Sequence, residues 1–367
     1  MDQAVRDGVF PGGVLAVRLG GEVRCLAPGG QLSSDPSGQP VKSSTIYDLA
    51  SLTKPLVTVT SVLMLIQSGK LELDAPIQDI LVDLEGAPIG LASVRELLNH
   101  CAGLPGWRPL YERLEAKGII SGLTQPASIR LAVLQLIRDE PLIHERRERS
   151  LYSDLGFILL GLAVERACGL PLDKHFDETV AKPLKAQPLL FCPAEAASSE
   201  AINQRVDLLS IAPTEWDDRR GRLLCGEVHD ENAAAMGGVA GHAGLFGTAG
   251  AVLAVSGAWL RAYCSQSSIL DRELVREFTM RPSDLPQSSW ALGWDTPSAP
   301  SSSGSYFSPA SFGHLGYTGT SLWIDPQQEL EVVLLSNRVH PSRKNDAIRA
   351  FRPLIHDLVF REYVSST

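Results

Sequence analysis

Ser51 and Lys54 stand three residues apart in the segment 48–55 (DLASLTKP), directly before a long apolar stretch. Residues three apart on a helix share a face, which would place the lysine amine about 5 Å from the serine hydroxyl. A serine hydroxyl at its ordinary pKa is a poor nucleophile, and a neighbouring base or cation activates it. A Ser-x-x-Lys pair supplies that neighbour without a histidine triad, so this spacing predicts a serine nucleophile. The motif is short enough to arise by chance, and its weight depends on the residues downstream.

Tyr152, in the run Tyr-Ser-Asp154, is a candidate for acid–base chemistry with Ser51. A phenol beside an ammonium can have a lowered pKa, because the positive charge favours the phenolate. Tyr152 would then act as the general base for Ser51 and afterwards donate a proton to the leaving group. The structural alternative is a tyrosine at an interface between lobes, with Asp154 as the N-cap of the following helix.

His314, in the run Gly-His-Leu-Gly316, stands just ahead of a predicted strand. Gly316 would let the backbone approach a substrate closely. The next backbone N–H, that of Tyr317, could complete an oxyanion hole with the N–H of Ser51. The alternative for His314 is a purely structural histidine beside a strand.

A glycine-rich run over 237–246 (GGVAGHAGLF) could form one wall of a substrate cleft or a tight crossing between two lobes. His242 and Phe246 are the side chains in this run that we expect to face a ligand. The preceding run 226–232 (GEVHDEN) would be a dense polar edge if it lies beside the cleft. It lacks the i, i+4 histidine pair of a helical zinc site, so we expect neither a metal nor another cofactor.

The elements that must position these residues begin with a β-rich stretch. Residues 14–19 and 22–26 flank Gly20-Gly21, which predicts a two-residue hairpin. Residues 53–67 are predicted to form a buried helix, in which Pro55 is tolerated only near the first turn. Ser51 would therefore lie at the helix entrance, where unpaired N–H groups and the helix dipole favour an oxyanion.

The middle of the chain is predicted to be mainly helical, and its end returns to strands. Helices are expected over 91–101, 127–139, 155–168 and 346–364, strands over 321–325 and 330–336, and surface loops over 194–201 and 297–311. We therefore expect an α+β fold, with a mixed, mainly antiparallel sheet built from both ends of the chain and flanked by helices. Residues 1–367 would form a single catalytic domain, with a discontinuous α/β lobe (1–75 and 240–367) and an inserted helical lobe (76–239). A cleft between the lobes is where a site is expected.

Composition narrows the class of protein. The 367 residues are 44% hydrophobic and 20% charged, as in an ordinary globular protein. A formal net charge of -9 argues against nucleic-acid partners and acidic membranes. No 18-residue apolar run predicts a membrane span, and the charged N-terminus does not resemble a signal peptide, so a cytoplasmic location is expected unless an export signal was trimmed. The six scattered cysteines contain no C-x-x-C pair, which indicates buried apolar side chains.

Together these runs resemble the serine β-lactamase and penicillin-binding-protein superfamily. The resemblance covers essentially the whole chain and is similar to the class C-like branch that also holds esterases, DD-peptidases and D-aminopeptidases. It is carried by Pro11-Gly-Gly13, S-x-x-K at Ser51, LLNHCAGLP (97–105), YSD at Tyr152, GHAGLFGTAG (241–250) and HLG at His314. The run 226–246 is also similar to a sub-branch in which some members act as exo-amidases on muramyl peptides.

The resemblance implies a β-lactamase/transpeptidase-like fold and an acyl-enzyme formed on Ser51. Lys54 and Tyr152 would share the acid–base work, in an order that the resemblance leaves open. Asp154 would stand where β-lactamases have Asn, and His314 where they have the Lys of K-T-G. An ionised Asp154 has no N–H to donate to a substrate carbonyl, so it could instead pair with Lys54 or bind a substrate amine. His314 is largely neutral near pH 7, which weakens a clamp on a β-lactam carboxylate.

These residues predict a serine hydrolase acting on small esters or amides, carboxylesterase-like and with weak or no β-lactamase activity. One alternative is a cell-wall peptide or amide hydrolase acting on muropeptide-like substrates: a DD-peptidase, D-aminopeptidase or muramyl-peptide amidase. The other is a non-catalytic binding protein that keeps the penicillin-recognising fold. The sequence does not predict an oligomeric state.

Overall fold

The computed structural model describes residues 1–35, 38–119, 124–192, 210–285 and 287–365. The strands are β1 (Gly12–Leu19), β2 (Glu22–Gly30), β3 (Tyr47–Asp48), β4 (Leu189–Phe191), β5 (Trp216–Asp217), β6 (Arg222–Leu223), β7 (Leu245–Gly247), β8 (Phe312–Leu315), β9 (Ser321–Asp325) and β10 (Leu330–Ser336). The α-helices are α1 (Asp2–Arg6), α2 (Thr60–Gln67), α3 (Val94–Leu98), α4 (Leu110–Ala116), α5 (Pro126–Arg138), α6 (Asp154–Cys168), α7 (Leu172–Phe176), α9 (Glu231–Ala235), α10 (Ala249–Tyr263), α11 (Arg272–Thr279) and α12 (Ile348–Tyr363).

The main sheet joins the two ends of the chain. Its strand order is β2-β1-β10-β9-β8, and each neighbouring pair is antiparallel. The predicted hairpin is confirmed: Gly20 and Gly21 connect β1 to β2 with φ of 58° and 82°, the left-handed region that glycine adopts without strain. β1 then pairs with β10 from Gly13 opposite Ser336 to Leu19 opposite Leu330.

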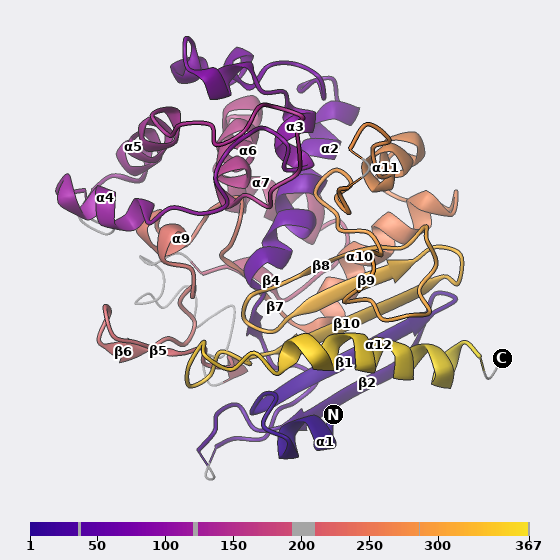
Figure 1. The fold of residues 1–367 in the computed structure, drawn as a ribbon. Coiled ribbons are helices and arrows are strands. Elements are labelled where there is room, and N and C mark those ends of the chain that lie inside the picture. Colours follow the sequence, from indigo (N-terminus) through magenta and orange to yellow (C-terminus); the bar gives the residue numbers. More distant parts are fainter. Residues whose placement is uncertain (36–37, 120–123, 193–209, 286, 366–367) are drawn as a thin grey trace.

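Helices cover both faces of this sheet, with α10 on one face and α12 on the other (Figure 1). The alternation of side chains along β1 explains the two layers. Val14 and Ala16 belong to the large core on the α10 side, whereas Leu15 and Val17 belong to the smaller core with α12. A strand buried on both faces has apolar residues at successive positions, which is why β1 and β10 contain long apolar runs.

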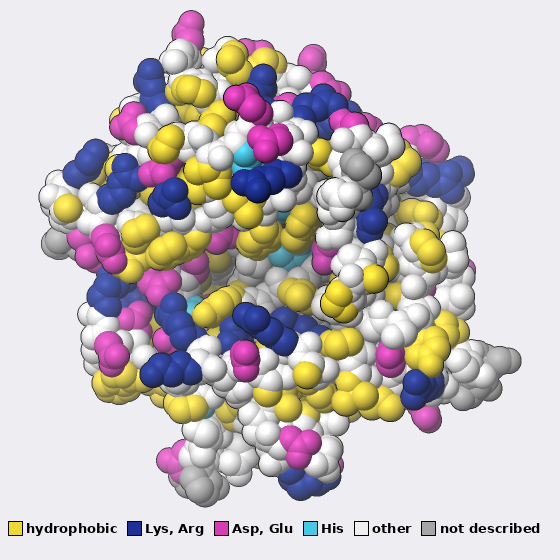
Figure 2. All heavy atoms as spheres, in the orientation of Figure 1, with side chains coloured by type: hydrophobic (Ala, Val, Ile, Leu, Met, Phe, Trp, Pro, Cys, Tyr) yellow, Lys and Arg dark blue, Asp and Glu magenta, His cyan; other side chains and the backbone are white. Residues whose placement is uncertain are grey.

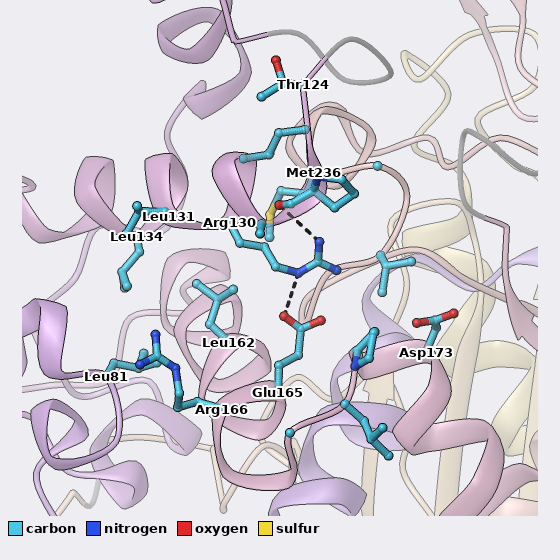
Figure 3. Close-up of a pocket in the computed structure, with 18 residues that line it drawn as sticks. Leu81, Thr124, Arg130, Leu131, Leu134, Leu162, Glu165, Arg166, Asp173 and Met236 are labelled. Atoms are coloured by element: carbon cyan, nitrogen blue, oxygen red, sulfur yellow. Dashed lines mark hydrogen bonds and ion pairs between the residues drawn. The ribbon is translucent and has the colours of Figure 1, made fainter.

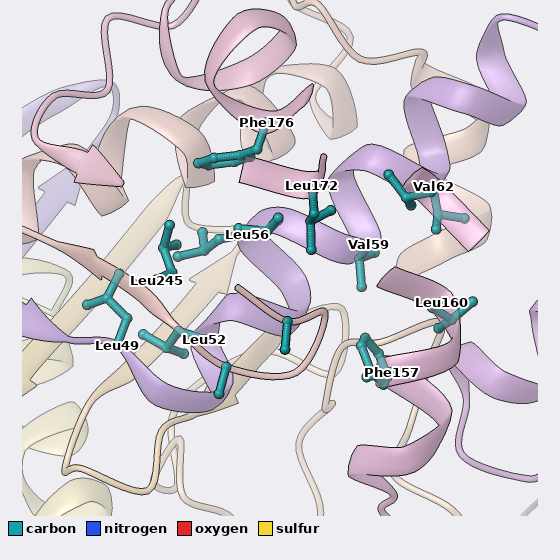
Figure 4. Close-up of a cluster of buried hydrophobic side chains, with 14 of the residues drawn as sticks. Leu49, Leu52, Leu56, Val59, Val62, Phe157, Leu160, Leu172, Phe176 and Leu245 are labelled. Atoms are coloured by element: carbon teal, nitrogen blue, oxygen red, sulfur yellow. The ribbon is translucent and has the colours of Figure 1, made fainter. Parts of the chain in front are cut away.

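The helical part of the chain lies between β3 and β7 and is centred on α6. Ser153 caps the N-terminus of α6 by accepting from the Gly156 N–H, and Gly169 ends the helix in the left-handed conformation. The cap is therefore Ser153 and not Asp154, which leaves the Asp154 carboxylate available for another partner. Apolar side chains from α6, α7 and the helix that follows Ser51 form the core shown in Figure 4.

Other predicted elements differ in detail from the structure. The helix expected over 91–101 is the shorter α3, which a capping box of Ser93 and Glu96 begins. The loop expected over 194–201 lies outside the described residues. The range 76–239, expected to be a helical lobe, also contains the strand β4. This strand pairs with β7, which lies after that range, in a three-stranded sheet of order β3-β7-β4.

Among the described residues, the helical stretch Ala50–Gln67 is long and apolar enough to cross a membrane by length and composition. It is 78% buried inside the fold, however, and its side chains belong to the hydrophobic core. Such a helix is weak evidence for a membrane span, because the core helices of globular proteins share its composition.

Candidate active site

Ser51 lies in a short 3₁₀ turn, Ala50–Leu52, at the entrance to the helix that runs on to Gln67. Pro55 occupies the first turn of the next helical segment, Lys54–Val59, as its missing N–H requires. Two threonines from the β8–β9 connection hold the turn: Thr318 donates to the Asp48 carbonyl at 2.7 Å and Thr320 to the Leu49 carbonyl at 3.0 Å. The sheet therefore sets the position of Ser51.

Lys54 is fully buried and contacts both Ser51 and the helical part of the chain. Its ammonium donates to Ser51 Oγ at 3.0 Å and to the backbone carbonyl of His242 at 3.2 Å. It also forms an ion pair with Asp154 Oδ1 at 2.7 Å, the alternative partner expected for an aspartate at this position. The Tyr152 hydroxyl is hydrogen-bonded to both Ser51 and Lys54.

Lys54 and Tyr152 are both held in their protonated forms. Burial alone would lower the pKa of Lys54, but the charges and hydrogen bonds of Asp154 and Tyr152 outweigh it and raise that pKa. Burial raises the pKa of Tyr152, and Asp154 adds to this, although Lys54 opposes both. The expected lowering of the Tyr152 pKa is therefore corrected, because desolvation of the phenolate exceeds the stabilisation that the ammonium provides.

His314 lies beneath Tyr152, with their ring centroids 5.9 Å apart. Its Nδ1 donates to the Leu315 carbonyl at 2.8 Å, which leaves Nε2 as a lone pair without a partner among the described residues. Burial and the nearby Lys54 lower the pKa of His314 to about 3, so the imidazole is neutral at physiological pH.

Gly316 has a different role from the one expected. A Cβ on this residue would lie 1.9 Å from Thr320 Oγ1 and 2.6 Å from the Leu49 carbonyl oxygen. The glycine thus allows the β8–β9 connection to approach the segment before Ser51, rather than a substrate. In the described part of the chain, the N–H groups of Ser51 and Tyr317 donate to no other group, as an oxyanion hole requires. The oxyanion hole that they would form stays a prediction.

The glycine-rich run provides one side chain to the site and one to the core. His242 Nε2 lies 2.8 Å from Asp230 Oδ1, and both residues line the cavity that contains Ser51. The expectation that Phe246 faces a ligand is corrected: it is 1% exposed in β7, opposite Leu190, and packs in the hydrophobic core. The alternation of a strand sends it inward.

The cavity at Ser51 has a volume of about 310 Å³. It is lined by Ala50, Ser51, Trp107, Tyr152, Asp154, His229, Asp230, Glu231, His242, Ala243, Tyr317 and Arg343. Figure 2 shows a hollow between the helical and the sheet-bearing parts of the molecule, with histidine side chains inside it. His229, Asp230 and Glu231 of the run 226–232 line this cavity, which is the condition under which the sequence predicts a dense polar edge.

A larger cavity of about 670 Å³ lies in the helical part, between α5 and α6 (Figure 3). Its lining is mainly apolar, and Arg130 is paired there with Glu165 at 2.7 Å. None of the predicted site residues lines it. The smaller cavity is the functional candidate because it contains Ser51.

Two residues at the site, Arg343 and Asp48, were missed from the sequence. Arg343, after β10, donates to Glu215 at 2.9 Å and to Glu231 at 2.8 Å, and it closes one edge of the cavity. Asp48 accepts from the N–H groups of Ala50 at 2.8 Å and His229 at 2.7 Å. An aspartate two residues before a non-glycine residue with positive φ is typical of an Asx turn, but no sequence pattern pointed to Arg343.

Comparisons with known proteins identify the family. The sequence model described as Beta-lactamase matches residues 1–354. A putative D-alanyl-D-alanine carboxypeptidase of Escherichia coli (strain K12) is 31% identical over 322 residues, covering 82% of this chain and 71% of that protein. A protein of the same name from Salmonella agona (strain SL483) is 30% identical over 325 residues, covering 83% and 72%.

Solved structures share the fold. EstCE1, a hydrolase with promiscuous acyltransferase activity, matches with a TM-score of 0.71 at 22% identity, over 96% of each chain. The octameric penicillin-binding protein homologue from Pyrococcus abyssi matches with a TM-score of 0.70 at 20% identity, over 96% of this chain and 75% of that one. At these identities the matches establish the fold alone, and they confirm the β-lactamase/transpeptidase-like fold expected from the sequence.

Proposed function

The chain belongs to the β-lactamase family and is a hydrolase of β-lactamase fold, and from this premise we propose that it hydrolyses small esters through an acyl-enzyme on Ser51. The observation that carries the proposal is the contact of one serine hydroxyl with both an ammonium and a phenol. Lys54 donates to Ser51 Oγ at 3.0 Å, and the Tyr152 hydroxyl bonds to the same serine. Such contacts activate a hydroxyl that is otherwise a weak nucleophile.

The proposed reaction has two steps. Ser51 Oγ bonds to the acyl carbon while the bond from that carbon to the leaving oxygen breaks. Tyr152, once ionised, takes the serine proton and then gives it to the leaving oxygen, so the phenolate is restored and an alcohol departs. Water then attacks the acyl carbon, the bond from that carbon to Ser51 Oγ breaks, and a proton of the water passes through Tyr152 to Ser51 as the acid is released. The buried Lys54 ammonium stabilises the negative charge that develops beside it.

His314 favours an ester over a β-lactam in this proposal. A β-lactam antibiotic carries a carboxylate, which a permanent cation at this position would bind through a charge-assisted hydrogen bond of about 1.5–3 kcal/mol. A buried imidazole with a pKa of about 3 offers no such charge. A small neutral ester needs no clamp of this kind, and a cavity of about 310 Å³ suits a short acyl group.

A D-alanyl-D-alanine carboxypeptidase is the second candidate, because the similar proteins from Escherichia coli and Salmonella carry that name. Its substrate is a peptide that ends in a carboxylate. Arg343 at the edge of the cavity is a cation that could receive such a group, although two glutamates already pair with it. D-amino-acid amides and muropeptides are further candidate amide substrates, and they are tested together with D-alanyl-D-alanine peptides.

The test is a panel of substrates with wild type and Ser51→Ala. We expect p-nitrophenyl acetate and butyrate to be hydrolysed, nitrocefin to be turned over slowly or not at all, and all turnover to vanish in Ser51→Ala. A fluorophosphonate probe should label Ser51 in the wild type. Turnover of D-alanyl-D-alanine peptides in preference to esters would select the second candidate.

Two outcomes would contradict the mechanism itself. Ester hydrolysis that persists in Ser51→Ala would exclude Ser51 as the nucleophile. A folded wild-type protein that forms no covalent adduct with phosphonate or labelled penicillin would instead support a non-catalytic binding protein.

A further inference from the structure

We propose that His100 is a positioning residue that holds Tyr152 against Ser51, an inference that rests on the proposed function. His100 belongs to the run 97–105 and does not line the cavity. It would act only through Tyr152, by fixing the backbone on both sides of that residue and packing against its ring.

Two hydrogen bonds tie His100 to the two neighbours of Tyr152. The His100 carbonyl accepts from the Leu151 N–H at 2.8 Å, and the His100 ring accepts from the Ser153 N–H through Nδ1 at 3.1 Å. One residue therefore holds the peptide group that directly follows the tyrosine and the one that precedes Leu151. Because the backbone on both sides is fixed, the direction of the Tyr152 side chain is fixed as well.

The ring of His100 is enclosed by aromatic side chains. Its centroid lies 4.8 Å from that of Tyr152, 5.2 Å from that of Phe157 and 4.7 Å from that of Trp290. The residue is 3% exposed, so the imidazole has little room to rotate away from Ser153. This enclosure keeps Nδ1 directed at the Ser153 N–H.

The hydrogen bond to Ser153 also requires one tautomer. An Nδ1 that accepts from a backbone N–H must carry a lone pair, so the proton of the neutral ring resides on Nε2. Burial and the nearby Lys54 favour the neutral ring, since both disfavour a second positive charge there. A protonated His100 would lose its bond to Ser153.

The backbone of His100 is in a conformation that few residues adopt. Its φ is +60°, in the left-handed region, directly after α3 ends at Leu98 and Asn99. Asparagine tolerates this region better than other non-glycine residues. Its carboxamide oxygen can also stand near the place of Nδ1 as an acceptor. Asparagine is therefore the conservative replacement, whereas phenylalanine keeps the ring and loses the acceptor.

The effect of a misplaced Tyr152 on the rate should depend on the leaving group of the ester. p-Nitrophenolate departs without a proton, but an ethoxide needs one, and in the proposed reaction that proton comes from Tyr152. A misplaced tyrosine should therefore slow an ethyl ester much more than a p-nitrophenyl ester of the same acid. A general loss of folded protein would slow both equally.

The experiment compares His100→Phe and His100→Asn with the wild type on ethyl and p-nitrophenyl butyrate. In His100→Phe we expect kcat for the ethyl ester to fall roughly 10²-fold more than kcat for the p-nitrophenyl ester, with KM little changed. His100→Asn should keep the wild-type ratio of the two rates within a few-fold. His175→Phe, which replaces another buried histidine, in α7 and outside the lining of the cavity that contains Ser51, is the matched control and should not change the ratio.

Equal losses on both esters in His100→Phe would overturn the inference, as would an asparagine variant with the same altered ratio as phenylalanine. The rate of Ser51 labelling by a fluorophosphonate keeps the inference testable if neither ester is a substrate. In that case His100→Phe should label more slowly than wild type and His100→Asn at a similar rate. Identical labelling rates in all three proteins would overturn the inference independently of the proposed substrate.

Discussion

Asp154 is the residue whose identity most changes the chemistry of the site. Its carboxylate lies 2.7 Å from the Lys54 ammonium and raises the pKa of both Lys54 and Tyr152. The resting site therefore holds an ammonium and a neutral phenol, and neither group is a ready base. Hydrolysis needs one of them to lose its proton, so we expect activity to rise as the pH becomes alkaline.

Asp154→Asn tests this account. Removing the negative charge should lower the pKa values of Lys54 and Tyr152, because the charge raises both in the native site. The ascending limb of kcat/KM against pH should then move to lower pH with p-nitrophenyl butyrate as substrate. A limb that stays in place, or moves to higher pH, would show that Asp154 does not control the ionisation of the site.

At the scale of elements, a close crossing delivers the His242 carbonyl to Lys54. Gly161 of α6 and Gly241 of the glycine-rich run meet backbone to backbone: a Cβ on Gly161 would lie 2.8 Å from Gly241 Cα. Thr58 reinforces the crossing by donating to the Gly241 carbonyl at 2.6 Å. The run 237–246 is thus both a wall of the cavity and a tight crossing, the two alternatives that the sequence left open.

Gly161→Ala should separate α6 from this crossing. The added methyl group has no free space, so we expect unfolding free energy to fall by about 1–3 kcal/mol and kcat to fall as Lys54 loses its carbonyl partner. Gly250→Ala in α10 is the matched control, because a Cβ there meets nothing within 4 Å. This control should gain about 0.4–1 kcal/mol, and urea denaturation with activity assays measures both variants. An unchanged stability in Gly161→Ala would contradict the close crossing.

At the scale of the whole molecule, the sheet holds together segments from the two ends of the chain. Glu331 on β10 is buried between Arg18 of β1 and Ser256 of α10, and Arg18 Nη2 donates to its Oε1 at 2.6 Å. The helix makes room for this pair, since a Cβ on Gly257 would lie 2.1 Å from Arg18 Nη2. The pair therefore links both terminal strands to the helix that covers them.

Arg18→Leu should leave the Glu331 carboxylate buried without its cation. We expect the free energy of unfolding to fall by about 3–5 kcal/mol, whereas Arg18→Leu combined with Glu331→Leu should recover most of the loss. The exposed pair of Arg24 with Glu22 is the control, and Arg24→Leu should change stability by less than about 0.5 kcal/mol. Urea unfolding of the four proteins measures these differences, and equal stabilities in the single and double variants would contradict the buried pair.

The sequence alone was sufficient for the hairpin, the helix after Ser51, the helices α5 and α6 and the family. Each of these depends on residues close together in the chain: Gly20-Gly21 in a turn, Pro55 in a first helical turn, or Gly169 after a helix. The segments that meet at the site were also predicted, because short motifs mark Ser51, Tyr152 and His314. The prediction depended on the residue types in these motifs and on the order of the motifs along the chain.

Only the tertiary structure decided the charges and the directions of side chains. The pKa of Tyr152 rises because many segments together exclude water from it, and no local pattern measures that desolvation. Phe246 points into the core while His242 points to the cavity, a choice made by the pairing of β7. Arg343 joins the cavity, and His100 brackets Tyr152, through contacts between residues far apart in sequence, which a motif cannot contain.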